Sequence, residues 1–175
     1  MHPYPDHLVQ QLMLRDGSVV TVRPIRPEDA EIEQQFVRNL SDESRYNRFM
    51  DSVRELSPRM LLHFTHVDYE RHMALIAVSG HGGAELQVGV ARYVVDADGR
   101  RCEFAIVIAD DWQRKGLGTL LMQALMAAAR TAGVRVMYGD VLASNQRMLQ
   151  LMARLGFAAR FDDDDPRQMR IEANL

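Results

Sequence analysis

Hydrophobic and polar residues recur with different periods along the chain, and the first third contains both strand and helix patterns. After a turn at Asp16-Gly17, Ser18–Arg23 alternates in a β-branched pattern that predicts a strand. Apolar positions then recur at helical spacing up to Leu40, after Pro27-Glu28-Asp29, a combination typical of a helix start. Ser41 and Ser57-Pro58 each predict the start of a further short helix, the first ending near Met50.

Patterns of strand length follow in the middle third. Met73–Val78 is a continuous apolar run, and Leu86–Val95 and Arg101–Ala109 are two further predicted strands. His81-Gly82-Gly83 predicts a turn between the first two, and Asp98-Gly99 is a strong hairpin signal between the last two. The three strands are therefore expected to pair as an antiparallel meander.

Helices and strands alternate in the last third. Leu117–Arg130 is apolar nearly all round, which predicts a helix buried against a sheet. Val134–Leu142 is a predicted strand, Asn145–Leu155 a helix, and further strands begin at Gly156-Phe157 and cover Gln168–Glu172. Together these patterns predict an α/β (α+β) fold, with a mixed, mostly antiparallel central sheet flanked by helices on both faces.

The length of 175 residues suits one domain, and the content of 47% apolar and 26% charged residues is ordinary for a globular protein. Residues 1–17 carry two prolines and no clean periodicity, so we expect an N-terminal arm or edge segment there. Residues 18–175 are expected to form the single domain, because no linker or internal repeat interrupts them.

Charge and cysteine content exclude several classes of function. The formal net charge of −3 argues against a nucleic-acid binder. No apolar run is long enough for a membrane span, and the first residues lack a signal-peptide pattern, so a cytoplasmic location is expected. The single cysteine, Cys102, excludes an internal disulfide, and the six histidines lack ligand spacing, so no metal is expected. The oligomeric state stays open, a dimer included.

The segment Phe104–Thr119 carries the candidate chemistry. A buried strand runs into a basic turn with Gly116 and Gly118, and a helix begins at the second glycine. Unpaired N–H groups and a partial positive charge make a helix start an anion site, to which Arg114 and Lys115 add charge. A plain strand-to-helix turn with solvated basic residues is the alternative. The pattern is neither a P-loop nor the dinucleotide-binding Gly-x-Gly-x-x-Gly.

Placed between an apolar strand and a buried helix, the order Gln113-x-x-Gly-x-Gly resembles the coenzyme A pyrophosphate loop of the GNAT acyltransferases. The resemblance extends to Ala143-Ser144-Asn145 and to Leu155-Gly156-Phe157. Three upstream segments resemble one branch of that family, the GNAT domain of bacterial Pat-type protein lysine acetyltransferases. These segments are Arg23–Ala30, Ser44-Arg45-Tyr46 with Arg48-Phe49, and Cys102–Ala105.

The resemblance implies a GNAT fold, acetyl-CoA as cosubstrate and direct acetyl transfer to a primary amine, with a protein lysine side chain favoured by the Pat branch. It also implies a set of cofactor-binding residues, which comprises Ile106, Val107 and Ile108 for the pantetheine arm, Gln113, Arg114, Lys115, Gly116, Leu117, Gly118 and Thr119 for the pyrophosphate, and Asn145. A helix cap explains Asn145 equally well and is compatible with cofactor contact.

Glu103 is the candidate general base. Period-two alternation places it on one strand face with Ala105 and Val107, and a glutamate buried there must be paired or have a raised pKa. The alternatives are an ion pair with Arg100 or Arg101, or an exposed strand start.

The general acid is less clear. Many GNAT enzymes carry a tyrosine three residues before the leucine of Leu-Gly-Phe, where this chain has Met152. We therefore expect solvent or another group to protonate the leaving thiolate, and Ser144 is the nearest hydroxyl in the sequence. Two other functions stay open, a small-molecule amine acetyltransferase and a catalytically idle coenzyme A-binding regulatory module.

Overall fold

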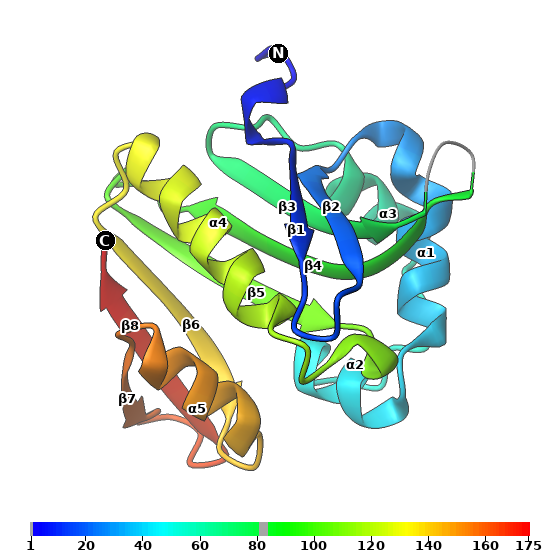
Figure 1. The fold of residues 1–175 in the computed structure, drawn as a ribbon. Coiled ribbons are helices and arrows are strands. Elements are labelled where there is room, and N and C mark those ends of the chain that lie inside the picture. Colours follow the sequence, from blue (N-terminus) through cyan, green and yellow to red (C-terminus); the bar gives the residue numbers. More distant parts are fainter. Residues whose placement is uncertain (1, 81–83) are drawn as a thin grey trace.

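A computed structural model describes residues 2–80 and 84–175, and in this part of the chain eight strands form one sheet (Figure 1). The strands are β1 (Gln10–Met13), β2 (Val19–Pro24), β3 (His72–Ser79), β4 (Leu86–Val95), β5 (Arg101–Ile108), β6 (Val136–Leu142), β7 (Ala158–Phe161) and β8 (Gln168–Asn174). The helices are α1 (Ala30–Asn39), α2 (Asp42–Phe49), α3 (Pro58–Thr65), α4 (Leu117–Thr131) and α5 (Gln146–Arg154).

The strand order is β1-β2-β3-β4-β5-β6-β8-β7. The pairing of β5 with β6 is parallel and the other neighbouring pairs are antiparallel, so the predicted mixed, mostly antiparallel sheet is confirmed. The predicted meander of β3, β4 and β5 is confirmed as well. A parallel pair needs a crossover, and α4 supplies it.

Helices cover both faces of the sheet, with α4 and α5 on one side and α1, α2 and α3 on the other (Figure 1). Each face has its own buried cluster. Leu121 and Leu125 of α4 pack in the larger one, while Phe36 and Val37 of α1 pack in the smaller one. The two clusters share the sheet, which fixes β5 between two packed layers.

Hydrogen bonds at the helix ends explain why several predicted boundaries hold. The Ser41 hydroxyl accepts from the backbone N–H of Ser44 at 3.1 Å and caps α2. The Ser57 hydroxyl accepts from the backbone N–H of Met60 at 3.2 Å and caps α3. The predicted turn at His81-Gly82-Gly83 lies outside the described residues.

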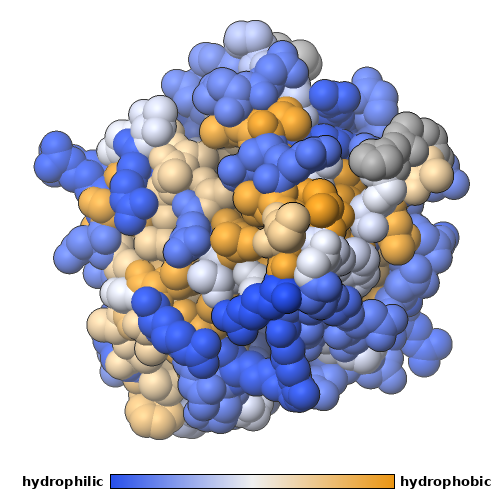
Figure 2. All heavy atoms as spheres, viewed as in Figure 1, coloured by the Kyte–Doolittle hydropathy of each residue, from blue (hydrophilic) through white to orange (hydrophobic). Residues whose placement is uncertain are grey.

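The N-terminal segment supplies the edge strand β1, which pairs antiparallel with β2. Val9, Met13 and Val19 are exposed beside this edge. Figure 2 shows apolar side chains gathered over β1 and β2, within a largely polar surface. In the residues that the structure describes, no helix has the length and apolar character that a membrane crossing requires.

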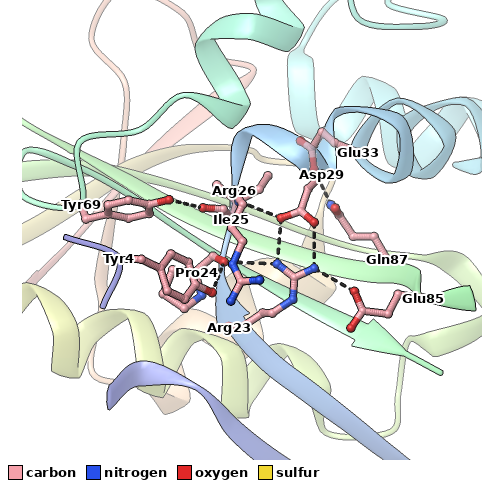
Figure 3. A network of polar contacts seen from close by, with 10 residues as sticks. All are labelled: Tyr4, Arg23, Pro24, Ile25, Arg26, Asp29, Glu33, Tyr69, Glu85 and Gln87. Atoms are coloured by element: carbon pink, nitrogen blue, oxygen red, sulfur yellow. Dashed lines mark hydrogen bonds and ion pairs between the residues drawn. The ribbon is translucent and has the colours of Figure 1, made fainter. Parts of the chain in front are cut away.

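A buried ion-pair network holds the start of α1 against β2 (Figure 3). Both guanidinium Nη atoms of Arg23 donate to the Asp29 carboxylate at 2.8 Å, and one of them also donates to Glu85 at 2.9 Å. Asp29 accepts in addition from the backbone N–H of Arg26 at 2.7 Å. Because Arg23 and Asp29 are both buried, their ion pair and hydrogen bonds compensate the cost of removing the two charges from water.

Candidate active site

The sheet opens between β5 and β6. These parallel strands pair only at Arg101–Val136, Cys102–Met137 and Glu103–Tyr138, although both continue further. The other side of β5 stays paired with β4 as far as Ile108. The edge of β5 from Phe104 onward therefore leaves backbone N–H and C=O groups without a strand partner among the described residues.

Gly139 allows β6 to lie close to β5 just beyond their last paired residues, where the two strands begin to separate. A Cβ atom built on Gly139 would lie 2.9 Å from Phe104 Cε1 and 3.1 Å from the Phe104 carbonyl oxygen. A side chain at this position would push β6 away from β5.

The opening forms a cleft of about 620 Å³. Its wall combines the free edge of β5, the loop before α4, the start of α5 and the inner side of α2. The lining residues are Arg15, Glu43, Ser44, Asn47, Arg48, Phe104–Ile108, Asp110, Gln113, Arg114, Gly116, Gly118, Thr119, Asp140, Val141, Ser144–Met148, Gln150, Leu151 and Arg154. Five arginines and three acidic residues are among them, so the cleft suits an anionic ligand.

The loop before α4 is shaped to present backbone N–H groups. Arg114 and Gly116 have positive φ values of 63° and 88°, and Gly116 is the residue that precedes the first turn of α4. No side chain among the described residues caps this helix start, so its first N–H groups are available to a ligand. A Cβ on Gly118 would lie 3.1 Å from Leu151 Cδ2, so a glycine there allows α4 and α5 to pack closely.

Asp110 joins this loop to α2. Its carboxylate accepts hydrogen bonds from the backbone N–H of Ser41 at 2.9 Å, the Ser41 hydroxyl at 2.7 Å and the Ser44 hydroxyl at 2.8 Å. The Gln113 side-chain amide donates to the Ile108 carbonyl at 3.0 Å and to the Ser44 hydroxyl at 3.4 Å. The wall formed by α2 is thereby fixed to the end of β5.

Glu103 lies at the inner end of the opening and is exposed. Of the alternatives open for Glu103, the structure therefore shows the exposed strand start and not a buried glutamate. The helices on this face do not cover the end of the sheet, and Val94, its register partner on β4, is 43% exposed. Partial loss of solvent raises the pKa of Glu103, and the negative charge of Asp140 raises it further, whereas the Arg170 guanidinium opposes both. Arg101 pairs instead with Glu172 at 2.7 Å.

Nine of the twelve residues proposed from the sequence line the cleft, and Glu103, Lys115 and Leu117 are not among its lining residues. The Leu117 side chain is buried in the larger core, so only its backbone N–H could face a ligand. The Lys115 ammonium points away, 3.0 Å from the Asp16 carboxylate and 4.8 Å from the centre of the Trp112 ring. The Asn145 side chain caps α5 by accepting from the Met148 N–H at 3.3 Å, and the residue also lines the cleft.

Sequence patterns did not reveal several lining residues. Arg15 comes from the turn between β1 and β2, and Arg48 comes from α2, where its guanidinium stacks 4.8 Å from the Phe49 ring centre. Asp140 lies on β6 and pairs with Arg170 at 2.6 Å. The segment that contains Arg48 was part of the family resemblance, which gave Arg48 no role at the site. No sequence pattern connects Arg15 to a loop about one hundred residues later.

Other candidate groups lie outside the cleft. Cys102 is buried, and burial raises its pKa to about 12, so the predicted apolar role fits better than a nucleophile. Met152 has 0% exposure and packs in the larger core. Within residues 2–80 and 84–175, no group of three His, Cys, Asp or Glu residues could hold a metal ion.

The cleft therefore has two chemically different parts. One is a positively charged helix start with available N–H groups, and the other is a free strand edge that can pair with an extended, amide-containing chain. Such a cleft fits a long ligand that carries phosphates at one end and amides along its arm, with Glu103 near the far end.

Comparisons with known proteins agree with this geometry. The family model described as "Acetyltransferase (GNAT) family" matches residues 34–157. A Pseudomonas aeruginosa protein named as an acetyltransferase is 40% identical over 164 residues, which cover 94% of this chain and 87% of the relative. The acetyltransferase Pat of Mycolicibacterium smegmatis is 32% identical over 83% of this chain, which spans only 43% of that relative's length.

Solved structures give the same result. The GNAT domain of S. lividans PAT superposes with a TM-score of 0.89 at 30% identity, covering 99% of this chain and 100% of that one. A cAMP-binding acyltransferase from Mycobacterium smegmatis superposes with a TM-score of 0.65 at 27% identity, over 96% of this chain and 48% of that one. The matched family model, the relatives and the architecture together show that this chain belongs to the GNAT family and is an acyl-CoA-dependent N-acetyltransferase.

Proposed function

We propose that this protein transfers an acetyl group from acetyl-CoA directly to a lysine side chain of another protein, with Glu103 as the general base. The observation that carries the proposal is the position of Glu103, which is exposed where β5 and β6 begin to separate, next to the cleft-lining Phe104, and has a raised pKa. A lysine on a large partner can approach this carboxylate from the uncovered sheet face beside Val94. The likeness to Pat-type acetyltransferases supports the same acceptor class.

Acetyl-CoA supplies a thioester carbonyl that is open to attack by an amine. The phosphates would be held by the backbone N–H groups at the start of α4, together with cleft arginines such as Arg114. The free edge of Ile106–Ile108 would hydrogen-bond the pantetheine arm as an added strand would. Asn145 would contact the cofactor from the start of α5.

A base is required because the acceptor amine is almost entirely protonated at neutral pH. With a pKa of ~10.4, about 1 lysine in 2,500 is neutral at pH 7, a cost of roughly 4.6 kcal/mol. A carboxylate whose pKa lies above its ordinary value accepts the amine proton more readily than an unperturbed one. Glu103 would take that proton either directly or through one water molecule.

The leaving thiol needs less assistance. Because thiol pKa values are near ~8.5, the thiolate leaves without strong acid catalysis. Met152 is buried in the core and offers no proton, which leaves solvent, or the exposed Ser144 hydroxyl in the cleft wall, for this step.

Mass spectrometry tests the acceptor class. Lysate proteins are incubated with isotope-labelled acetyl-CoA and either the wild-type enzyme or the Glu103→Gln variant. Labelled acetyl-lysine at discrete sites, present only with the wild-type enzyme, is the expected result. Label that appears only on free amino acids or polyamines would show a small-molecule acceptor, and no enzyme-dependent label in either fraction would indicate a binding module.

A further inference from the structure

One cation of the cleft comes from outside the segment that the family model matches. That model covers residues 34–157, whereas Arg15 belongs to the turn between β1 and β2. The backbone N–H of Arg15 donates to the carbonyl oxygen of Lys115 at 3.1 Å. The N-terminal hairpin is thus bonded directly to the loop that precedes α4.

The Arg15 side chain lies over Gly116. A Cβ atom built on Gly116 would lie 3.3 Å from Arg15 Nε and 3.6 Å from Arg15 Cγ. Gly116 precedes the first turn of α4, so the guanidinium lies next to the positive end of the helix dipole. In the part of the chain that the structure describes, this guanidinium makes no hydrogen bond or ion pair, and two positive groups so close together favour an anion between them.

The neighbouring Lys115 is already paired. Its ammonium lies 3.0 Å from one oxygen of the Asp16 carboxylate, and the other oxygen accepts from the backbone N–H and hydroxyl of Ser18 at 3.0 and 2.5 Å. The hydrogen bonds from Ser18, and then the Lys115 ammonium, hold the pKa of Asp16 well below its ordinary value. The Lys115 ammonium therefore lies at this carboxylate, and Lys115 is not among the residues that line the cleft.

We propose that Arg15, rather than Lys115, is the side chain of this turn that neutralises the pyrophosphate of coenzyme A. A guanidinium presents a planar fork of donors that matches two phosphate oxygens, which suits a position over the helix start. This proposal rests on the proposed binding of acetyl-CoA in the cleft. It makes the N-terminal hairpin a part of the cofactor site.

Calorimetry with coenzyme A and with its 3′-dephospho form tests the proposal. Arg15→Gln is expected to weaken the binding of both ligands by about tenfold, because a charge-assisted hydrogen bond to the pyrophosphate is lost. Lys115→Gln is expected to weaken it by less than about threefold, because that ammonium lies at Asp16 and not in the wall of the cleft. Arg59→Gln, an equal change of charge at an exposed position of α3 outside the cleft, is the matched control and should leave both affinities unchanged. Thermal unfolding of each variant monitors the fold.

Three outcomes would overturn this assignment. They are an unchanged affinity in Arg15→Gln, an equal or larger loss in Lys115→Gln, and a loss confined to the ligand that carries the 3′-phosphate. A wild-type protein that binds neither ligand would instead contradict the proposed function, and with it this assignment.

Discussion

Glu103 and Tyr138 form the last pair of residues that joins β5 to β6. The Tyr138 hydroxyl donates to Asp96 at 2.9 Å, and burial together with this carboxylate raises its pKa to about 12. Tyr138 is therefore neutral at physiological pH, and Glu103 is the member of the pair that can accept a proton.

The first prediction concerns catalysis. Glu103→Gln should lower kcat by about 10²–10⁴-fold, the usual contribution of a general base, because glutamine keeps the shape but cannot take the amine proton. The affinity for acetyl-CoA should stay within about twofold, since the residues proposed to hold the cofactor do not include Glu103. Steady-state rates and calorimetry measure the two quantities. Wild-type turnover in the variant would exclude Glu103 as the base.

The pH dependence should follow the charge of Asp140. The base must be deprotonated, so the rate falls as the pH drops through the raised pKa of Glu103. Asp140→Asn removes a negative charge that raises this pKa and leaves the opposing Arg170 unpaired, so the acidic limb of the pH–rate profile should move to lower pH. Asp51→Asn, an exposed aspartate on another loop, serves as the control. If the acidic limb of the pH–rate profile does not move in Asp140→Asn, Asp140 does not influence the pKa of the catalytic base.

The connection between α2 and the loop before α4 should depend on Asp110. Asp110→Ala removes three hydrogen bonds to Ser41 and Ser44, so the backbone amides of α2 should exchange with solvent faster. The neighbouring exposed residue offers a matched control, and Asp111→Ala should leave the exchange of α2 unchanged. Hydrogen–deuterium exchange followed by mass spectrometry measures both, and equal protection in the two variants would refute the role.

Stability should depend strongly on Asp29. Asp29→Ala leaves the buried Arg23 with Glu85 alone, and breaking a buried pair from one side costs about 3–5 kcal/mol. Because Arg23 keeps Glu85 as a partner, we expect the free energy of unfolding to fall by about 3 kcal/mol, the lower end of this range. Urea denaturation measures it, with Asp163→Ala at an exposed loop position as the reference. A loss below about 1 kcal/mol would show that Glu85 and water compensate fully.

Local sequence signals were sufficient for most of the fold. The starts of α2 and α3 are each fixed by a hydrogen bond from a backbone N–H to the hydroxyl of Ser41 or Ser57, three residues earlier. Such a short-range contact can be predicted from a local stretch of sequence. The strands of the meander could also be predicted, because the apolar run Met73–Val78 and the turn at Asp98-Gly99 are short-range features of the sequence.

The site was less predictable because it depends on contacts between distant segments. The hydrogen bond from Arg15 to Lys115 joins parts of the chain that share no pattern, so no sequence window places Arg15 beside the loop that precedes α4. The exposure of Glu103 depends on where the helices of the opposite layer end, which period-two alternation cannot show.

The pairing of Lys115 with Asp16 also affects how an acetylation assay can be interpreted. Lys115 is the only lysine in the sequence, and its ammonium lies at the Asp16 carboxylate, outside the residues that line the cleft. The single lysine side chain of this sequence therefore lies apart from the cleft in which its own cosubstrate would bind. Self-labelling is confined to one lysine-containing peptide and the N-terminus, so acetyl-lysine in any other peptide of a reaction mixture records the acceptor.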